Sequence, residues 1–203
     1  QIDFKSDASI IALQGPNSVK NLSSLYYIKL EKFHLYQDEE VMIARTGYTG
    51  ELGVEIISDA NKGSEIWDYF ISKDIQPIGL AARDTLRLEA GFNLYGSDMT
   101  VENNPYDSNL EWTVDQSEQD RDYIGKKALK HLQDTKNRLV GFYTDARGVL
   151  RSGTKVSFEG GEGVITSGTW SPTFKKNIGF CRVTKNFPKI YYLIVNRCLC
   201  NAD

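Results

Sequence analysis

The chain has 203 residues, which is enough for one large domain or two modest ones with a sizeable core. Its 24 Lys and Arg residues against 27 Asp and Glu residues leave a net charge of −3. That charge argues against a nucleic-acid partner bound mainly through its phosphates. The longest apolar runs are too short to span a bilayer, and segment 1–7 lacks the apolar core of a signal peptide. We therefore expect no nucleic-acid partner, no membrane and a cytoplasmic location.

The cysteines and histidines do not form a metal-binding pattern. Cys198 and Cys200 are separated by one residue, and Cys181 lies well before them. With only His34 and His131 elsewhere, a structural zinc site would lack ligands. We predict reduced thiols and no metal.

In chain order, apolar periodicity and turn residues predict alternating strands and helices up to Gly91. Ile66, Phe70 and Ile71 recur at helical spacing, and Gly91 is a natural C-terminal stop for the helix before it. The predicted strands are 9–13, 33–36, 41–44 and 52–57, and the predicted helices are 17–25, 61–73 and 79–90.

Beyond Gly91 the pattern thins and then changes character. Residues 110–114 are predicted to form a strand and 121–133 a helix. After these come short predicted strands, separated by Gly, Ser, Asn and Pro, at 138–143, 155–158, 163–166, 179–183 and 191–195. Such strands indicate a small barrel or sandwich. We predict an α+β fold, with a mixed α/β domain over 1–136 followed by a small antiparallel β-barrel domain over 137–203.

Two segments are candidates for chemistry. In the first, Gly47, Gly50 and Gly53 surround Tyr48 and Glu51, so a tight turn brings an aromatic ring and a carboxylate to one spot. In the second, a predicted helix carries two arginines, Arg83 and Arg87, one turn apart. Like charges at that spacing repel, which favours nearby carboxylates or an anionic ligand.

Both segments closely resemble the glycine cleavage system aminomethyltransferase (T-protein) family, which depends on tetrahydrofolate. Three further strings match that family in the family's own order. The five strings are Arg45-Thr-Gly-Tyr-Thr-Gly-Glu51-Leu-Gly-Val-Glu55, Pro77-Ile-Gly-Leu-Ala-Ala-Arg83-Asp-Thr-Leu-Arg87-Leu-Glu89-Ala-Gly91-Phe-Asn-Leu-Tyr-Gly96, Ile11-Ala-Leu-Gln-Gly-Pro16, Asp120-Arg-Asp-Tyr-Ile-Gly125-Lys-Lys-Ala-Leu129 and Gly163-Val-Ile-Thr-Ser-Gly-Thr-Trp-Ser-Pro-Thr173.

This resemblance implies a folate-binding domain over 1–136, with its N-terminal part missing, and a truncated barrel domain over 137–203. It implies a transferase that moves the methylene carbon of an aminomethyl group from a lipoylated carrier protein of the glycine cleavage system to tetrahydrofolate. Ammonia is released, no metal is needed, and in a eukaryote the location would be the mitochondrial matrix. Catalysis of this kind is mainly positioning, with a carboxylate assisting proton movement.

The resemblance also assigns residues to the folate site. Glu51 matches the glutamate that recognises the pterin, whose adjacent amino and ring N–H groups suit a bidentate carboxylate. Arg83 matches the arginine at the folate site. The alternatives are a solvated turn carboxylate for Glu51 and an ordinary ion pair for Arg83. Arg87 is assigned to a structural ion-pair network, and Asp84 to orienting Arg83.

Two aromatic residues complete the predicted folate site. Tyr48 and Trp112 could pack on the pterin or aminobenzoyl rings, because aromatic faces suit flat heterocycles. For Trp112 the residues alone favour a core position, with packing on a folate ring as the alternative.

The family's catalytic aspartate lies upstream of the Ile11–Pro16 string, so the catalytic residue is unknown in this chain. The distal barrel strands and a C-terminal arginine are also missing, and we expect this chain alone to be inactive. Two other functions remain open. One is the folate domain of a sarcosine or dimethylglycine oxidising enzyme or a folate-dependent demethylase. The other is a non-enzymatic folate-binding factor for iron–sulfur cluster assembly, although its Lys-Gly-Cys motif is absent here.

Overall fold

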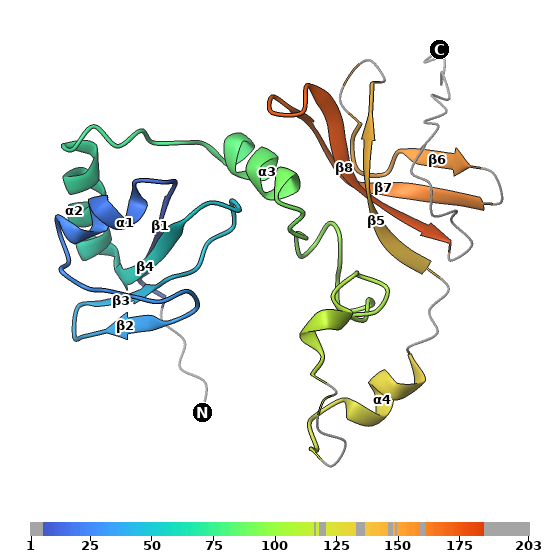
Figure 1. Ribbon diagram of the computed structural model, residues 1–203, viewed down its shortest axis with the longest axis horizontal. Helices are drawn as coiled ribbons and strands as arrows, with labels where there is room; N and C mark the ends of the chain where they lie inside the picture. The colour runs from blue at the N-terminus through green and yellow to red at the C-terminus, as the bar shows by residue number, and fades with distance from the viewer. Residues whose placement is uncertain are drawn as a thin grey trace. The chain divides into compact units, whose positions relative to one another are not determined.

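The computed structural model describes residues 6–115, 117, 121–132, 137–145, 148, 150–158 and 161–184. The chain divides into two compact units, Gln1–Ala90 and Gly91–Asp203, which are drawn in Figure 1. The boundary at 136/137 expected from the sequence stays a prediction.

The first unit is built on a four-stranded antiparallel sheet in the order β1-β4-β3-β2. Its strands are β1 (Ala8–Gln14), β2 (Leu35–Gln37), β3 (Val41–Ala44) and β4 (Gly53–Asp59). Leu13 of β1 lies opposite Val54 of β4, and Ile43 of β3 lies opposite Ile56. These four residues are all buried, so one face of the sheet is apolar. The four strands predicted in this part are confirmed.

Two helices cover the apolar face of that sheet. Helix α1 (Ser18–Ser23) contributes Leu22, and helix α2 (Ala60–Ile71) contributes Ile66 and Phe70 to the same core. Helix α2 begins where the Asp59 carboxylate accepts a hydrogen bond from the backbone N–H of Lys62, a standard N-terminal cap. The third helix, α3 (Leu80–Glu89), ends before Gly91, whose φ of +79° stops the helix as predicted.

The second unit opens with a long segment, 91–110, whose backbone forms turns and one isolated bridge in place of helix or strand. It leads into a short 3₁₀ helix, Glu111–Thr113, where the sequence predicted a strand. Asn109 adopts a left-handed φ of 58°, and the Thr113 hydroxyl donates to the Leu110 carbonyl 2.7 Å away. Both features favour a local turn over an extended strand. The strand prediction was wrong.

The core position predicted for Trp112 was wrong as well, because its side chain is 80% exposed. Helix α4 (Lys126–His131) is shorter than predicted and begins after Gly125, whose φ of +90° is incompatible with a helix interior.

Among the described residues from 137 onward, this unit forms a second antiparallel sheet, in the order β5-β8-β7-β6. Its strands are β5 (Asn137–Thr144), β6 (Lys155–Phe158), β7 (Gly161–Ser171) and β8 (Lys176–Thr184). Its core contains Phe142, Ile165, Cys181 and Val183. The predicted fold class, α+β followed by antiparallel β, is confirmed. The strand predicted at 191–195 lies outside the described residues.

Candidate functional site

The loop that carries Tyr48 and Glu51 joins β3 to β4 and is organised by one side chain from β1. The amide nitrogen of Gln14 donates to the carbonyl oxygen of Thr46 at 3.3 Å and to that of Val54 at 3.1 Å. The amide oxygen of Gln14 accepts a hydrogen bond from the Thr49 hydroxyl at 3.2 Å. One amide therefore ties together both ends of the loop and a residue near its tip.

Two glycines make room for that amide. A Cβ added at Gly47 would lie 2.0 Å from the Gln14 Oε1, and a Cβ added at Gly53 would lie 2.4 Å from the same side chain. Gly50 is needed for a different reason, since its φ is +79°. The sequence predicted a tight turn from these glycines but missed Gln14. The available signal was a polar residue at the end of an apolar strand.

The loop is further fixed to the start of α1. The carbonyl oxygen of Leu52 accepts hydrogen bonds from the Gly15 N–H at 2.7 Å and from the Ser18 hydroxyl at 3.0 Å. The backbone N–H of Glu51 donates to the Thr49 hydroxyl at 3.4 Å, so the backbone is held before and after Glu51 while its side chain is exposed. The Glu51 carboxylate makes no hydrogen bond or ion pair with the residues that the structure describes. It therefore remains available to accept hydrogen bonds from a ligand.

Arg83 of α3 packs on the Tyr48 ring. The central carbon of its guanidinium lies 4.9 Å from the ring centroid, within the range of a cation–π contact. Within the described part of the chain, Arg83 forms no ion pair with a carboxylate. Stacking on a ring leaves the donors at the edge of a guanidinium free to point elsewhere.

Arg87, one turn later, has a different environment. Its side chain is almost completely buried, and its Nε donates to the Asp84 carboxylate at 2.8 Å. Asp84 thus pairs with Arg87, and the expectation that it orients Arg83 was wrong. The repulsion expected between the two arginines is relieved because one is paired with a carboxylate and the other is stacked on a ring.

A cavity of about 230 Å³ lies within the first unit, beside β1. Its walls include Leu13 of β1 and Phe70 of α2, and its polar lining includes Gln14, Thr49 and Arg83. Mostly apolar walls with a few convergent polar groups are typical of small-molecule sites. In the described ranges, no three His, Cys, Asp or Glu side chains are placed to hold a metal ion. Likewise, no described helix is long and apolar enough to cross a bilayer.

The structure therefore brings Tyr48 and Arg83 together and places Glu51 three residues along the same loop. Trp112, the fourth predicted residue, belongs to the second unit. The fold and this arrangement define an α+β protein with a candidate small-molecule site in its first unit and an antiparallel β domain after it. Residues 2–118 match the family described as the GCVT N-terminal domain, and residues 137–192 match the glycine cleavage T-protein C-terminal barrel domain. The chain belongs to the glycine cleavage T-protein family.

Individual relatives agree with this. The chain is 42% identical over 191 residues to the aminomethyltransferase of Francisella tularensis subsp. tularensis (strain SCHU S4 / Schu 4), covering 89% of this chain and 53% of the relative. It is 41% identical over 196 residues to that of Stenotrophomonas maltophilia (strain K279a), covering 90% and 53%. The crystal structure of glycine cleavage system aminomethyltransferase T from Bartonella henselae is similar, with a TM-score of 0.80 and 32% identity over 87% of this chain and 52% of that one. The chain spans about half the length of these relatives.

Proposed function

We propose that this chain is part of an aminomethyltransferase of the glycine cleavage system. In this proposal, the aminomethyl group arrives on a lipoylated carrier protein and its methylene carbon passes to tetrahydrofolate with release of ammonia. The observation that carries the proposal is the loop of Tyr48 and Glu51 with Arg83 stacked upon it, in a chain that is 42% identical to a curated aminomethyltransferase. Tetrahydrofolate is the substrate that accepts the carbon, and we propose no metal.

Glu51 would recognise the pterin. Its carboxylate is exposed and makes no hydrogen bond or ion pair in the described chain, while its backbone is fixed through Leu52 and Thr49. A fixed carboxylate can accept both the amino group and the ring N–H of the pterin, two donors that lie side by side. The loop thus supplies pre-organisation, which lowers the entropy that binding must otherwise overcome.

Arg83 and Tyr48 would hold the ring system from the side. Because Arg83 lies over the Tyr48 ring, its guanidinium plane is restrained while its edge donors can reach a carbonyl of the pterin. Trp112, with its exposed indole, would supply a further flat face for the pterin or aminobenzoyl ring. Neither role needs a charged nucleophile in this chain.

The chemical step would depend mainly on positioning. Two nitrogens of tetrahydrofolate form bonds to the methylene carbon, while its bonds to the lipoyl sulfur of the carrier and to the amino nitrogen both break. The two protons lost from the tetrahydrofolate nitrogens balance those gained by the departing thiol and ammonia. We assign no residue of this chain to that proton transfer. The location in the cytoplasm, or in the mitochondrial matrix of a eukaryote, stays a prediction.

An ammonia-release assay tests the proposal. It uses the full product of the gene that encodes this chain, a lipoylated carrier protein loaded with an aminomethyl group, and tetrahydrofolate. We expect ammonia release that depends on tetrahydrofolate and is lowered in Glu51→Gln. Folate binding with no release in the presence of the loaded carrier would contradict the transferase and favour a folate-binding factor. Activity on sarcosine or dimethylglycine in place of the carrier would favour an oxidising or demethylating relative.

A further inference from the structure

We propose that Arg182 is a positioning residue that holds the segment carrying Trp112 in place on the second sheet. This inference rests on the proposed function, because it gives Trp112 a role in folate binding. It concerns residues of the second unit alone. Neither Arg182 nor its partners was singled out from the sequence, where Arg182 lies between apolar residues near the end of strand β8.

The segment before Trp112 needs an external restraint. Residues 91–110 have turns in place of a continuous helix or strand, and an irregular stretch of this length in a compact unit is usually functional. Trp112 follows in a single 3₁₀ turn and is 80% exposed, so its own side chain packs on little that could fix its place. The position of the indole therefore depends on what holds the backbone.

The guanidinium of Arg182 bridges two points of that segment. One nitrogen, Nη2, donates to the backbone carbonyl of Asp98 at 2.6 Å. The other, Nη1, donates to the backbone carbonyl of Asp107 at 3.0 Å and to its carboxylate at 3.2 Å. The side chains of Arg182 and Asp107 are both largely buried. A planar fork with several fixed donors suits such a bridge, and one ammonium group could not span both points.

The Asp98 carboxylate provides a second attachment to the sheet. It is almost completely buried and accepts hydrogen bonds from the Thr166 hydroxyl at 2.5 Å and the Ser167 hydroxyl at 2.7 Å. Neighbouring side chains of a regular strand point to opposite faces, so two adjacent hydroxyls do not normally reach one carboxylate. Strand β7 has a register shift between Ile165 and Ser167, and such a bulge re-aims a side chain. The irregularity thus brings both hydroxyls to Asp98.

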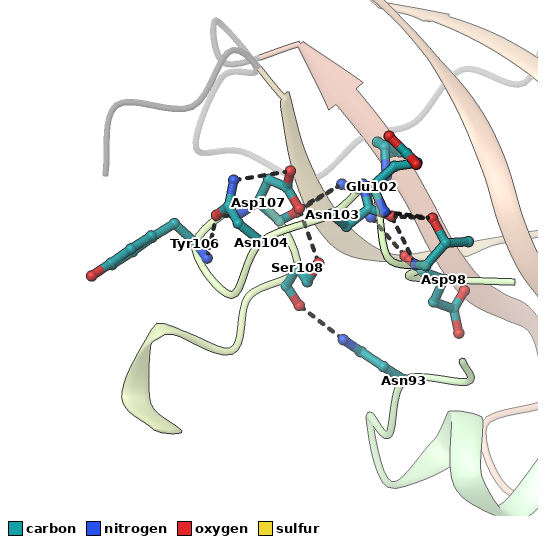
Figure 2. Close-up of polar contacts among 10 residues, drawn as sticks. Asn93, Asp98, Glu102, Asn103, Asn104, Tyr106, Asp107 and Ser108 are labelled. Atoms are coloured by element: carbon teal, nitrogen blue, oxygen red, sulfur yellow. Dashed lines mark hydrogen bonds and ion pairs between the residues drawn. The ribbon is translucent and has the colours of Figure 1, made fainter. Parts of the chain in front are cut away.

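The restraint continues from Asp107 toward Trp112. Figure 2 shows the contacts that close the loop: the Asn104 amide donates to the Asp107 carboxylate at 3.4 Å, and the Asn93 amide donates to the carbonyl of Ser108 at 2.8 Å. The Leu110 N–H then donates to the Pro105 carbonyl at 2.8 Å, immediately before the 3₁₀ turn. Arg182 therefore holds, through Asp107 and these hydrogen bonds, the loop that ends at Leu110, two residues before Trp112.

A spectroscopic measurement on the full gene product tests the positioning directly. The near-ultraviolet circular dichroism of Trp112 is obtained as the difference between each protein and the same protein carrying Trp112→Phe. We expect Arg182→Met to abolish most of this signal and Arg182→Lys to restore part of it. Arg138→Lys, an exposed arginine on strand β5, is the matched control and should leave the signal unchanged. An unaltered Trp112 signal in folded Arg182→Lys or Arg182→Met would overturn the proposal.

A double-mutant cycle on tetrahydrofolate affinity tests whether Arg182 affects folate binding through Trp112. We expect Arg182→Lys to weaken binding roughly fivefold to tenfold in the parent, and less than about twofold in a Trp112→Ala background, because coupled residues are not additive. Equal losses of affinity in both backgrounds would overturn the proposal that Arg182 acts through Trp112. If the parent protein binds no tetrahydrofolate, the proposed function fails, and the Trp112 signal still decides whether Arg182 positions the segment.

Discussion

The Arg83 guanidinium stacks 4.9 Å from the centroid of the Tyr48 ring, while Arg87, on the same helix, is buried against Asp84. Two arginines that look alike in the sequence therefore have different physical roles. Arg83 is restrained by an aromatic face, and we propose that the donors at its edge bind the ligand. Arg87 is buried and forms an ion pair with the Asp84 carboxylate on its own helix.

This difference predicts opposite phenotypes for two alanine variants. Arg83→Ala should weaken tetrahydrofolate binding by roughly tenfold, as expected for the loss of a charged hydrogen bond to a ligand, with a nearly unchanged melting temperature. Arg87→Ala should instead destabilise the fold by about 1–3 kcal/mol, because Asp84 loses the buried partner of its ion pair. The loss stays in this range because Asp84 is exposed enough for water to hydrate its carboxylate. Calorimetric titration and thermal melts separate the two. A collapsed melting temperature with normal affinity in Arg83→Ala would reverse our assignment.

The Gln14 amide predicts a strong coupling between two sites in the glycine loop. Gly47→Ala should destabilise the protein by about 1–3 kcal/mol, because the new methyl group displaces Gln14 from its carbonyl partners. In a Gln14→Ala background the same change should have a much smaller effect, because the steric conflict is gone. Urea unfolding of the four proteins measures the coupling. Additive losses would show that Gln14 does not set the shape of this loop.

A pair of glycines on neighbouring strands of the second sheet predicts opposite changes in stability. A Cβ at Gly179 would lie 2.0 Å from the backbone oxygen of Ser167, so Gly179→Ala should destabilise the sheet by more than about 2 kcal/mol. Gly141, on β5, lies opposite Phe180 of β8, and a Cβ added at Gly141 would have open space around it. Gly141→Ala should therefore be neutral or stabilise by about 0.5–1 kcal/mol. Denaturant midpoints measure both, and equal midpoints would argue against the close approach of β7 to β8.

The buried thiol of Cys181 predicts a loss of stability in alkaline solution. Burial raises the pKa of Cys181 from 9.0 to about 12. Below pH 9 the thiol is neutral in both folded and unfolded chains, and above it only the unfolded chain ionises. Stability should therefore fall between about pH 9 and 12, by up to about 1.4 kcal/mol per pH unit from this group. Urea unfolding at pH 8, 9 and 10 should show a steeper decline in the parent than in Cys181→Ala, and parallel declines would contradict the burial effect.

The elements with clear periodicity could be predicted from the sequence, but the long-range contacts could not. Strand β4 and helix α2 have unambiguous apolar spacing, and they pack as the pattern indicates. Leu110, Trp112 and Val114 alternate like a strand, yet a left-handed Asn109 and a side-chain hydrogen bond from Thr113 favour a turn. The apolar periodicity of a segment does not reveal that contacts favouring a turn compete with the strand.

The candidate site shows the same limit. Tyr48, Glu51 and Arg83 were found through a resemblance between strings, since a glycine turn alone has many uses. The roles of Gln14 and Arg182 depend on partners 32 to 84 residues away in sequence, which no local pattern reveals. Only the folded arrangement shows why a glutamine ends β1 and why an arginine interrupts the apolar strand β8.

The most direct test of the account is the tetrahydrofolate affinity of Glu51→Gln, measured by calorimetric titration on the full gene product. Removing the charge from an acceptor of two pterin donors should cost about 1.5–3 kcal/mol, or roughly tenfold to a hundredfold in affinity. Glu39→Gln, an exposed carboxylate in the turn between β2 and β3, is the matched control and should bind as the parent does. A large loss confined to Glu51→Gln is the predicted result. Equal affinity in all three proteins would contradict pterin recognition by Glu51, and with it the proposed site.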